Sequence, residues 1–211
     1  TTADTLALKY YAIKTMQKLE GFHLSDKNPE PLVDVWLKRL EFVRDNSILA
    51  QKDSLYLSAL LSMSDRYSKN HVNADILFKL AQEFIKSGNR YNPFLGDEFK
   101  WDLKKSLEYC NEAIDNYPLS DGAQNCKTLL PGLTNTTLEL ITRYAQPENT
   151  PSLGLLKYRN TSKVYFKLIS IDPKEDRTLR QKYQNDVLVD KYNEKQTTAS
   201  WELEIIDDGD R

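Results

Sequence analysis

The chain has 211 residues, of which 40% are apolar and 28% are charged, a composition typical of a globular protein and too apolar for a disordered one. Its 29 basic and 31 acidic residues leave a net charge of −2 and are spread along the chain. This distribution argues against a nucleic-acid-binding protein, which usually carries a basic stripe. No apolar run approaches the ~18 residues that a membrane-spanning helix needs.

The first part of the chain predicts six amphipathic helices. Apolar residues recur there at helical spacing, and Gly, Pro and polar loops separate the repeats. The predicted helices cover residues 6–20, 32–44, 53–67, 74–87, 101–117 and 120–130. We expect Gly21 to end the first helix, Asn73 to cap the fourth, and Pro131 to lie beyond the end of the sixth.

Six such helices joined by polar loops predict an α-hairpin array. Ala113, the Tyr117–Pro118 break and Ala123 resemble the second helix of a tetratricopeptide repeat and the start of the next hairpin. The first-helix signature of that repeat is absent, and the segment at residues 92–100 interrupts its ~34-residue period. The interpretation is therefore a repeat-like array with a concave face that can dock a partner.

Beyond about residue 135 the apolar residues alternate. Val164, Phe166 and Leu168 alternate with Tyr165 and Lys167, and this period of two is typical of a strand. The predicted strands cover residues 137–144, 153–158, 163–171 and 201–206, the second and third forming a pair.

We expect Asn160 in the turn between the second and third strands, because asparagine tolerates a left-handed backbone. Residues 179–192 fit either a short helix or an ordered loop. Because no helix is clearly predicted between consecutive strands, the pattern favours an antiparallel sandwich, of which part of the ~7 strands would be missing. The expected fold class is α+β, with a helical repeat-like domain at residues 1–133 and an incomplete β domain at residues 134–211.

Two cysteines flank the predicted turn between the fifth and sixth helices. Cys110 lies eight residues before Pro118, and Cys126 lies eight residues after it. Antiparallel helices that turn at Pro118 would bring these positions level, within the ~7 Å between Cα atoms that a disulfide needs. Two buried free thiols are the alternative, because cysteine is a common core residue. No metal site is predicted, because no histidine lies near either cysteine.

No catalytic or cofactor site is predicted. Acidic neighbours such as Asp97 and Glu98 are ordinary on a surface this rich in charge, and His23 and His71 are expected to be solvated. The glycines form no phosphate-binding loop, and the serines show no nucleophile elbow. We expect a protein that is not an enzyme. The aromatic loop at residues 91–99 is expected to fold back onto the array, with a partner site as the alternative.

Several segments together carry a resemblance to a known family. They are Tyr117-Pro118-Leu119-Ser120 with Gly122-Ala123 and Cys126, then Tyr158-Arg159-Asn160 with Val164-Tyr165-Phe166, then Trp201-Glu202 before Asp207-Asp208-Gly209-Asp210. Their order resembles the N-terminal part of the large alpha-2-macroglobulin-like proteins of Bacteroidetes. In that family a helical, repeat-like segment precedes the first macroglobulin-type β-sandwich.

The resemblance implies an exported protein in the periplasm or attached to the outer membrane, much larger than this chain, that traps or inhibits proteases. This chain would be its non-catalytic N-terminal module, and its partners would be proteins, with proteases reached through the full-length parent. The family's thioester chemistry is not carried over, because the chain has no Cys-x-Glu-Gln sequence.

We also expect the chain to be a fragment, because it does not begin with Met, its N-terminus lacks the basic-then-apolar order of a signal peptide, and a predicted strand at residues 201–206 lies close to its last residue. The alternative is a stand-alone helical-repeat adaptor for protein–protein interaction.

Overall fold

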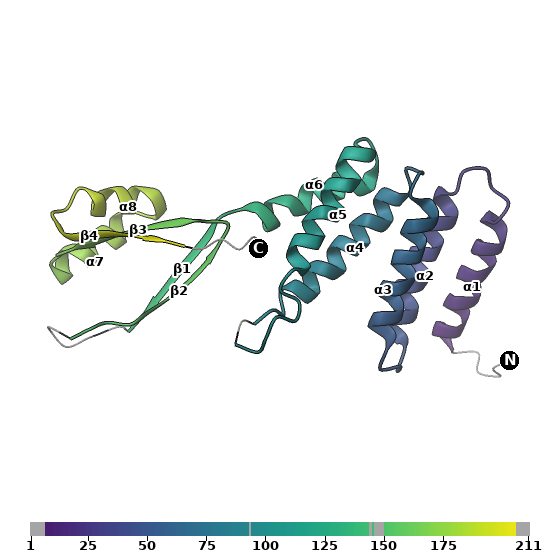
Figure 1. Cartoon of the computed structure of the whole chain (residues 1–211), viewed down its shortest axis with the longest axis horizontal. Helices are drawn as coiled ribbons and strands as arrows, with labels where there is room; N and C mark the ends of the chain where they lie inside the picture. Colours follow the sequence, from purple (N-terminus) through teal and green to yellow (C-terminus); the bar gives the residue numbers. More distant parts are fainter. Residues whose placement is uncertain (1–6, 93, 144, 146–149, 206–211) are drawn as a thin grey trace. The chain divides into compact units, whose positions relative to one another are not determined.

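The computed structural model describes residues 7–92, 94–143, 145 and 150–205, and its fold class is α+β, as predicted (Figure 1). The chain divides into two compact units between Thr134 and Asn135. Helices make up the first unit, and the second contains four strands and two helices among its described residues. The predicted ends of two strands, at Tyr144 and Ile206, and the segment at residues 207–210 lie outside the described residues.

The first unit contains the six predicted helices. They are α1 (Leu8–His23), α2 (Glu30–Asn46), α3 (Lys52–Tyr67), α4 (Asn73–Gly88), α5 (Asp102–Asn116) and α6 (Asp121–Thr134). Each helix packs against the next one along the chain, and α6 also packs against α4. This serial packing of neighbours is what a chain of amphipathic helices with short loops produces.

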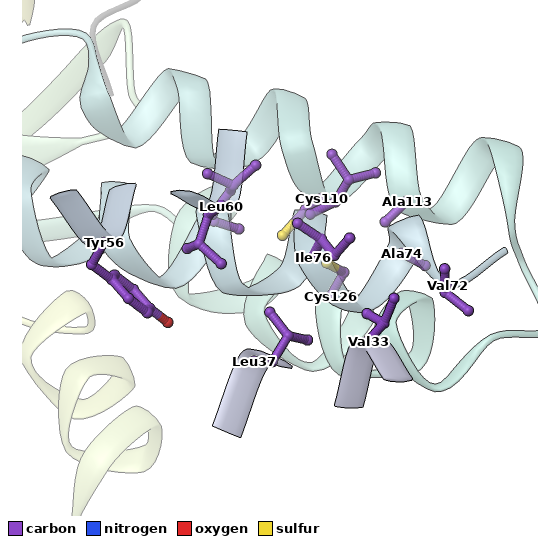
Figure 2. Close-up of a cluster of buried hydrophobic side chains, with 13 residues drawn as sticks. Val33, Leu37, Tyr56, Leu60, Val72, Ala74, Ile76, Cys110, Ala113 and Cys126 are labelled. Atoms are coloured by element: carbon purple, nitrogen blue, oxygen red, sulfur yellow. The ribbon is translucent and has the colours of Figure 1, made fainter. Parts of the chain in front are cut away.

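The core of this unit is one cluster of buried side chains from α2 to α6 and the residue before α4 (Figure 2). Helix α4 contributes more of it than any other helix, because its apolar residues face both α3 and α5. The sequence predicted this stripe around Leu77, Leu80 and Ala81, all of which are buried. Helix α1 contributes no buried residue. The centre of the unit therefore lies at the hairpins α3–α4 and α5–α6.

Three predicted helix boundaries are wrong. Helix α1 continues through Gly21 to His23, and α6 continues through Pro131 to Thr134. A glycine in a helix costs only ~1 kcal/mol relative to alanine, so α1 can continue through Gly21. The last turn of α6 is retained because Leu133 is buried and the Thr134 hydroxyl donates to the Leu130 carbonyl oxygen at 2.9 Å.

The predicted cap at Asn73 is also wrong. Asn73 lies inside α4 with its side chain buried, and no described atom hydrogen bonds to its amide group. The turn before α4 is closed instead by Asn70, whose side-chain oxygen accepts a hydrogen bond from the Val72 N–H at 3.2 Å. Helix α4 thus begins at Asn73, one residue earlier than predicted, because the Asn70 side chain accepts the hydrogen bond that closes the preceding turn.

The second unit contains two small antiparallel sheets. Strand β1 (Thr137–Thr142) pairs with β2 (Gly154–Arg159), and β3 (Lys163–Ile169) pairs with β4 (Thr197–Glu204). Phe166 and Trp201 lie opposite each other in the second sheet, with their rings stacked at 5.3 Å between centroids. Among the described strand residues only Val164 is buried.

The expectation that the second and third strands pair with each other is wrong. Strands β2 and β3 belong to different sheets, although Asn160 between them has the predicted left-handed backbone, with φ at 53°. The reason lies in its hydrogen bonds. The Asn160 amide donates to the Asn135 carbonyl oxygen at 3.1 Å, and the Thr136 hydroxyl donates to the Asn160 carbonyl oxygen at 3.0 Å. The turn is thereby tied to the start of β1 and not to a hairpin with β3.

Two helices, α7 (Pro173–Lys182) and α8 (Asn185–Asn193), lie between β3 and β4. The sequence left residues 179–192 open between a short helix and a loop, and the helix alternative is confirmed. The expectation that no helix lies between consecutive strands is wrong for β3 and β4. Helix α7 has a typical N-terminal cap. The Asp172 carboxylate accepts hydrogen bonds from the N–H groups of Lys174 and Glu175, and Pro173 occupies the first turn. The Tyr192 hydroxyl on α8 donates to Asp176 on α7 at 2.7 Å.

Candidate functional site

A groove of about 560 Å³ opens on the first unit, lined by residues of α2, α4 and α6 and by the turn before α4. Its apolar lining includes Val33 and Leu37 from α2, Val72 from the turn and Phe78 from α4. The first three are buried and hold the helices together, while Phe78 is half-buried. Every second helix of the array thus contributes one wall, as in the concave face of a helical repeat protein.

The polar lining of the groove is mainly acidic. Among its described residues five are carboxylates and two are lysines: Glu30, Asp34, Glu41, Asp75, Asp121, Lys38 and Lys79. Lys38 pairs with Asp34 at 2.7 Å, and Lys79 pairs with Glu41 at 2.6 Å. Three carboxylates remain that no lysine or arginine pairs with among the described residues.

These three carboxylates, on Glu30, Asp75 and Asp121, each lie in the first turn of a helix, α2, α4 and α6 respectively. A negative charge at this position is favoured by the helix dipole, which explains why each helix carries one. The dipole does not explain why all three line the same groove. That gathering follows from the packing of alternate helices with their N-termini at the same end of the groove.

The electrostatics of Asp75 show that the groove carries excess negative charge. Burial raises the pKa of the Asp75 carboxyl above its ordinary value, and the nearby charges of Asp121, Glu30 and Asp34 raise it further. His71 acts in the opposite direction, and its Nε2 atom lies 3.7 Å from Glu30. The folded chain therefore holds like charges together that a bound cation would stabilise.

The two cysteines lie together in the core beside Ile76 and Ala113, Cys110 on α5 and Cys126 on α6 (Figure 2). Both are fully buried, and the structure contains them as free thiols. A hydrogen bond between the two thiols lowers the pKa of Cys110, and the same bond together with burial raises that of Cys126. The turn at Pro118 thus juxtaposes the pair, while the disulfide itself stays a prediction.

The histidines and the aromatic loop singled out in the sequence do not gather at one site. His23 lies at the end of α1, where its Nδ1 atom is 2.7 Å from Asp26. Within the described ranges, no three His, Cys, Asp or Glu side chains are grouped to hold a metal ion. The expectation that the loop at residues 91–99 folds back is wrong for its tip, where the Phe94 and Leu95 side chains project into solvent and are 90% and 84% exposed.

No protein-family model, no curated protein and no solved structure matches this chain. Within the described part of the chain, no helix has both the length and the apolar character needed to cross a membrane. The groove carboxylates are the residues that sequence reasoning missed. Their only signal is an acidic residue in the first turn, which α3 and α5 share, so the three form a site only when the packing is known.

Proposed function

We propose that this chain is a non-catalytic module that docks a protein partner through the groove of α2, α4 and α6. In this proposal it is the N-terminal part of a large alpha-2-macroglobulin-like envelope protein that traps or inhibits proteases. The groove is the observation that carries the docking role, because it combines a hollow with an apolar floor and uncompensated charge on a rigid helical scaffold.

The α5–α6 turn supports the proposed family relationship. The Ser120 hydroxyl oxygen accepts a hydrogen bond from the Ala123 N–H at 3.2 Å, and its own proton goes to the Tyr117 carbonyl oxygen at 2.7 Å. Gly122 lies against the backbone of Ala74 so closely that a Cβ atom would meet it at 2.2 Å. These resemblance-bearing residues thus share a packing role in the turn between two helices of a repeat-like array.

The second unit supports the proposal that its strands belong to a larger macroglobulin-like sandwich. Large apolar side chains remain exposed on both two-stranded sheets, including Leu138, Leu155, Trp201 and Leu203. A two-stranded sheet is marginal by itself, and a sandwich needs ~7 strands to bury its inner faces. Additional strands from the parent protein would cover these side chains.

The size and location of the native protein test this proposal. An antibody raised against the chain should detect, in fractionated source cells, a band far larger than 24.5 kDa in the envelope fraction. Such a band is expected if the chain is one module of a macroglobulin-like parent. A band near 24.5 kDa in the cytosol would contradict the proposal and favour a stand-alone helical-repeat adaptor.

A further inference from the structure

We propose that the groove binds a short basic segment of a partner protein, in which lysine or arginine side chains stand next to apolar ones. This inference rests on the proposed docking function and adds the chemistry of the partner. The volume of about 560 Å³ lies within the ~300–1,000 Å³ of pockets that enclose small ligands, so it has room for a few side chains and not for a whole domain.

The floor of the groove selects the apolar part of this segment. Val33, Leu37 and Phe78 line the hollow, and the first two are almost completely buried in the core, so they offer little surface themselves. The packed core fixes the shape of the hollow, so an apolar side chain can be seated against Phe78 without requiring the helices to rearrange. Phe78 remains only half-buried and is the part of the floor that a partner would cover.

The carboxylates at the rim of the groove favour the basic residues of the proposed segment. Glu30, Asp75 and Asp121 approach one another from three different helices, and no described lysine or arginine pairs with them. Burial, and after it repulsion from Asp121 and Glu30, raise the pKa of Asp75, so the groove of the free protein holds an unfavourable charge arrangement. A lysine or arginine from a partner would relieve it. Charge complementarity thus favours a basic segment over an acidic or neutral one.

The paired lysines strengthen this assignment. Lys38 and Lys79 line the groove, but each is held by a carboxylate of its own, Asp34 and Glu41. Their charges are therefore balanced within the groove, which leaves the excess negative. The groove differs in this respect from the exposed loop tip at Phe94 and Leu95, which is apolar and offers no charge pattern that would select an occupant.

Fluorescence anisotropy with the whole 211-residue chain tests the proposal. The first probe is a short labelled peptide in which lysine and leucine alternate, and the others replace lysine by glutamate or leucine by serine. We expect the lysine–leucine peptide to bind with an affinity that falls as salt is added. The glutamate–leucine peptide should not bind, and the lysine–serine peptide should bind more weakly, because it leaves the apolar floor uncovered.

Two double variants with the same loss of charge separate a built site from general attraction. Glu30→Gln with Asp75→Asn removes two groove carboxylates and should weaken binding of the lysine–leucine peptide by about tenfold. Glu112→Gln with Asp115→Asn removes two exposed carboxylates of α5, which does not line the groove, and should leave binding unchanged. Far-UV circular dichroism should show the same helical content in both variants.

Equal weakening by both double variants, or no binding of the lysine–leucine peptide to the unmodified chain, would overturn the inference. These results do not touch the family proposal, which the antibody experiment decides. A large envelope protein whose N-terminal chain ignores the peptide would contradict only the basic-segment inference. A small cytosolic protein that binds the peptide in the groove would contradict only the macroglobulin-like parent.

Discussion

Replacing Gly122 by alanine should destabilise the helical unit, although the substitution puts a better helix former into α6. A Cβ atom at this position would lie 2.2 Å from the Ala74 carbonyl carbon, 2.3 Å from its oxygen and 2.5 Å from the Asp75 nitrogen. All three atoms belong to the backbone of α4, so no side chain can rotate away. Helix α6 itself would have to move.

The size of the effect follows from this distance. Carbon atoms in contact lie ~3.5 Å apart, so α6 would have to withdraw by roughly 1.3 Å at its first turn. Such overpacking costs about 1–3 kcal/mol, against a gain of less than ~1 kcal/mol from helix propensity. The shift also separates Ala123 and Cys126 from the core in which both are fully buried. We expect a net loss of about 2 kcal/mol and a fall in Tm of roughly 5–10 °C.

Urea unfolding followed by circular dichroism at 222 nm measures this loss, because helices dominate the signal. Gly132→Ala in the same helix is the matched control, since its added Cβ atom meets nothing within 4 Å. The control should leave stability unchanged or raise it by up to ~1 kcal/mol. If Gly122→Ala is as stable as the control, α6 does not approach α4 as closely as described, and the packing explanation of the Tyr117–Cys126 motif is refuted.

Three further perturbations test individual contacts. If the protein is exported, as proposed, thiol counting in denaturant should find no free thiol before reduction and two afterwards, because Cys110 and Cys126 face each other in the core. Glu83→Gln should lower the free energy of unfolding by about 1–3 kcal/mol, because Arg44, whose side chain is 13% exposed, loses a charged partner at 2.8 Å. Asp75→Asn should raise the free energy of unfolding at pH 7, because the ionised Asp75 carboxylate is unfavourable in the folded protein. This advantage over wild type should shrink as the pH falls through the raised pKa of Asp75, because the folded wild type then binds a proton more readily than the unfolded chain.

Each of these predictions has a contradicting outcome. Two free thiols before reduction would show that the cysteines are separate buried thiols. For the ion pair, Glu194→Gln breaks a more exposed contact with Lys191 and should leave stability nearly unchanged. An equal effect of both glutamate variants would mean that Arg44 is not held as described. An Asp75→Asn variant less stable than wild type at pH 7 would show that the helix dipole outweighs burial and repulsion.

Much of the fold could be predicted because its signals are local. The apolar stripe of α4 around Leu77 and Leu80 repeats within the helix itself, and the alternation in β3 repeats within the strand. The errors lie where a tertiary contact outweighs a local signal. Pro131 remains inside α6 because Leu133 beyond it is buried, and β2 pairs with β1 because the turn at Asn160 is tied to Asn135.

The candidate site was less predictable, since its residues are ordinary one at a time. Glu30, Asp75 and Asp121 are first-turn carboxylates, which any helix tolerates and favours. Nothing in their spacing along the chain distinguishes them from Asp53 or Asp102, which also begin helices. Only the alternation of helix directions in the array places the first three around one groove. The sequence therefore predicted a concave docking face without its residues.

The residues that carry the family resemblance and the residues that line the groove have different roles. Tyr117, Ser120 and Gly122 close the α5–α6 turn and seat α6 on α4, so they would be retained in a relative that docks a different partner. Asp75 does not help to close that turn. Burial and the neighbouring carboxylates raise its pKa, so they make its charge unfavourable in the free protein. If Asp75→Asn is the more stable protein at pH 7, a charge that costs stability and faces a hollow is better explained by binding than by folding. Substitution at Gly122 thus tests the architecture, and substitution at Asp75 tests the function.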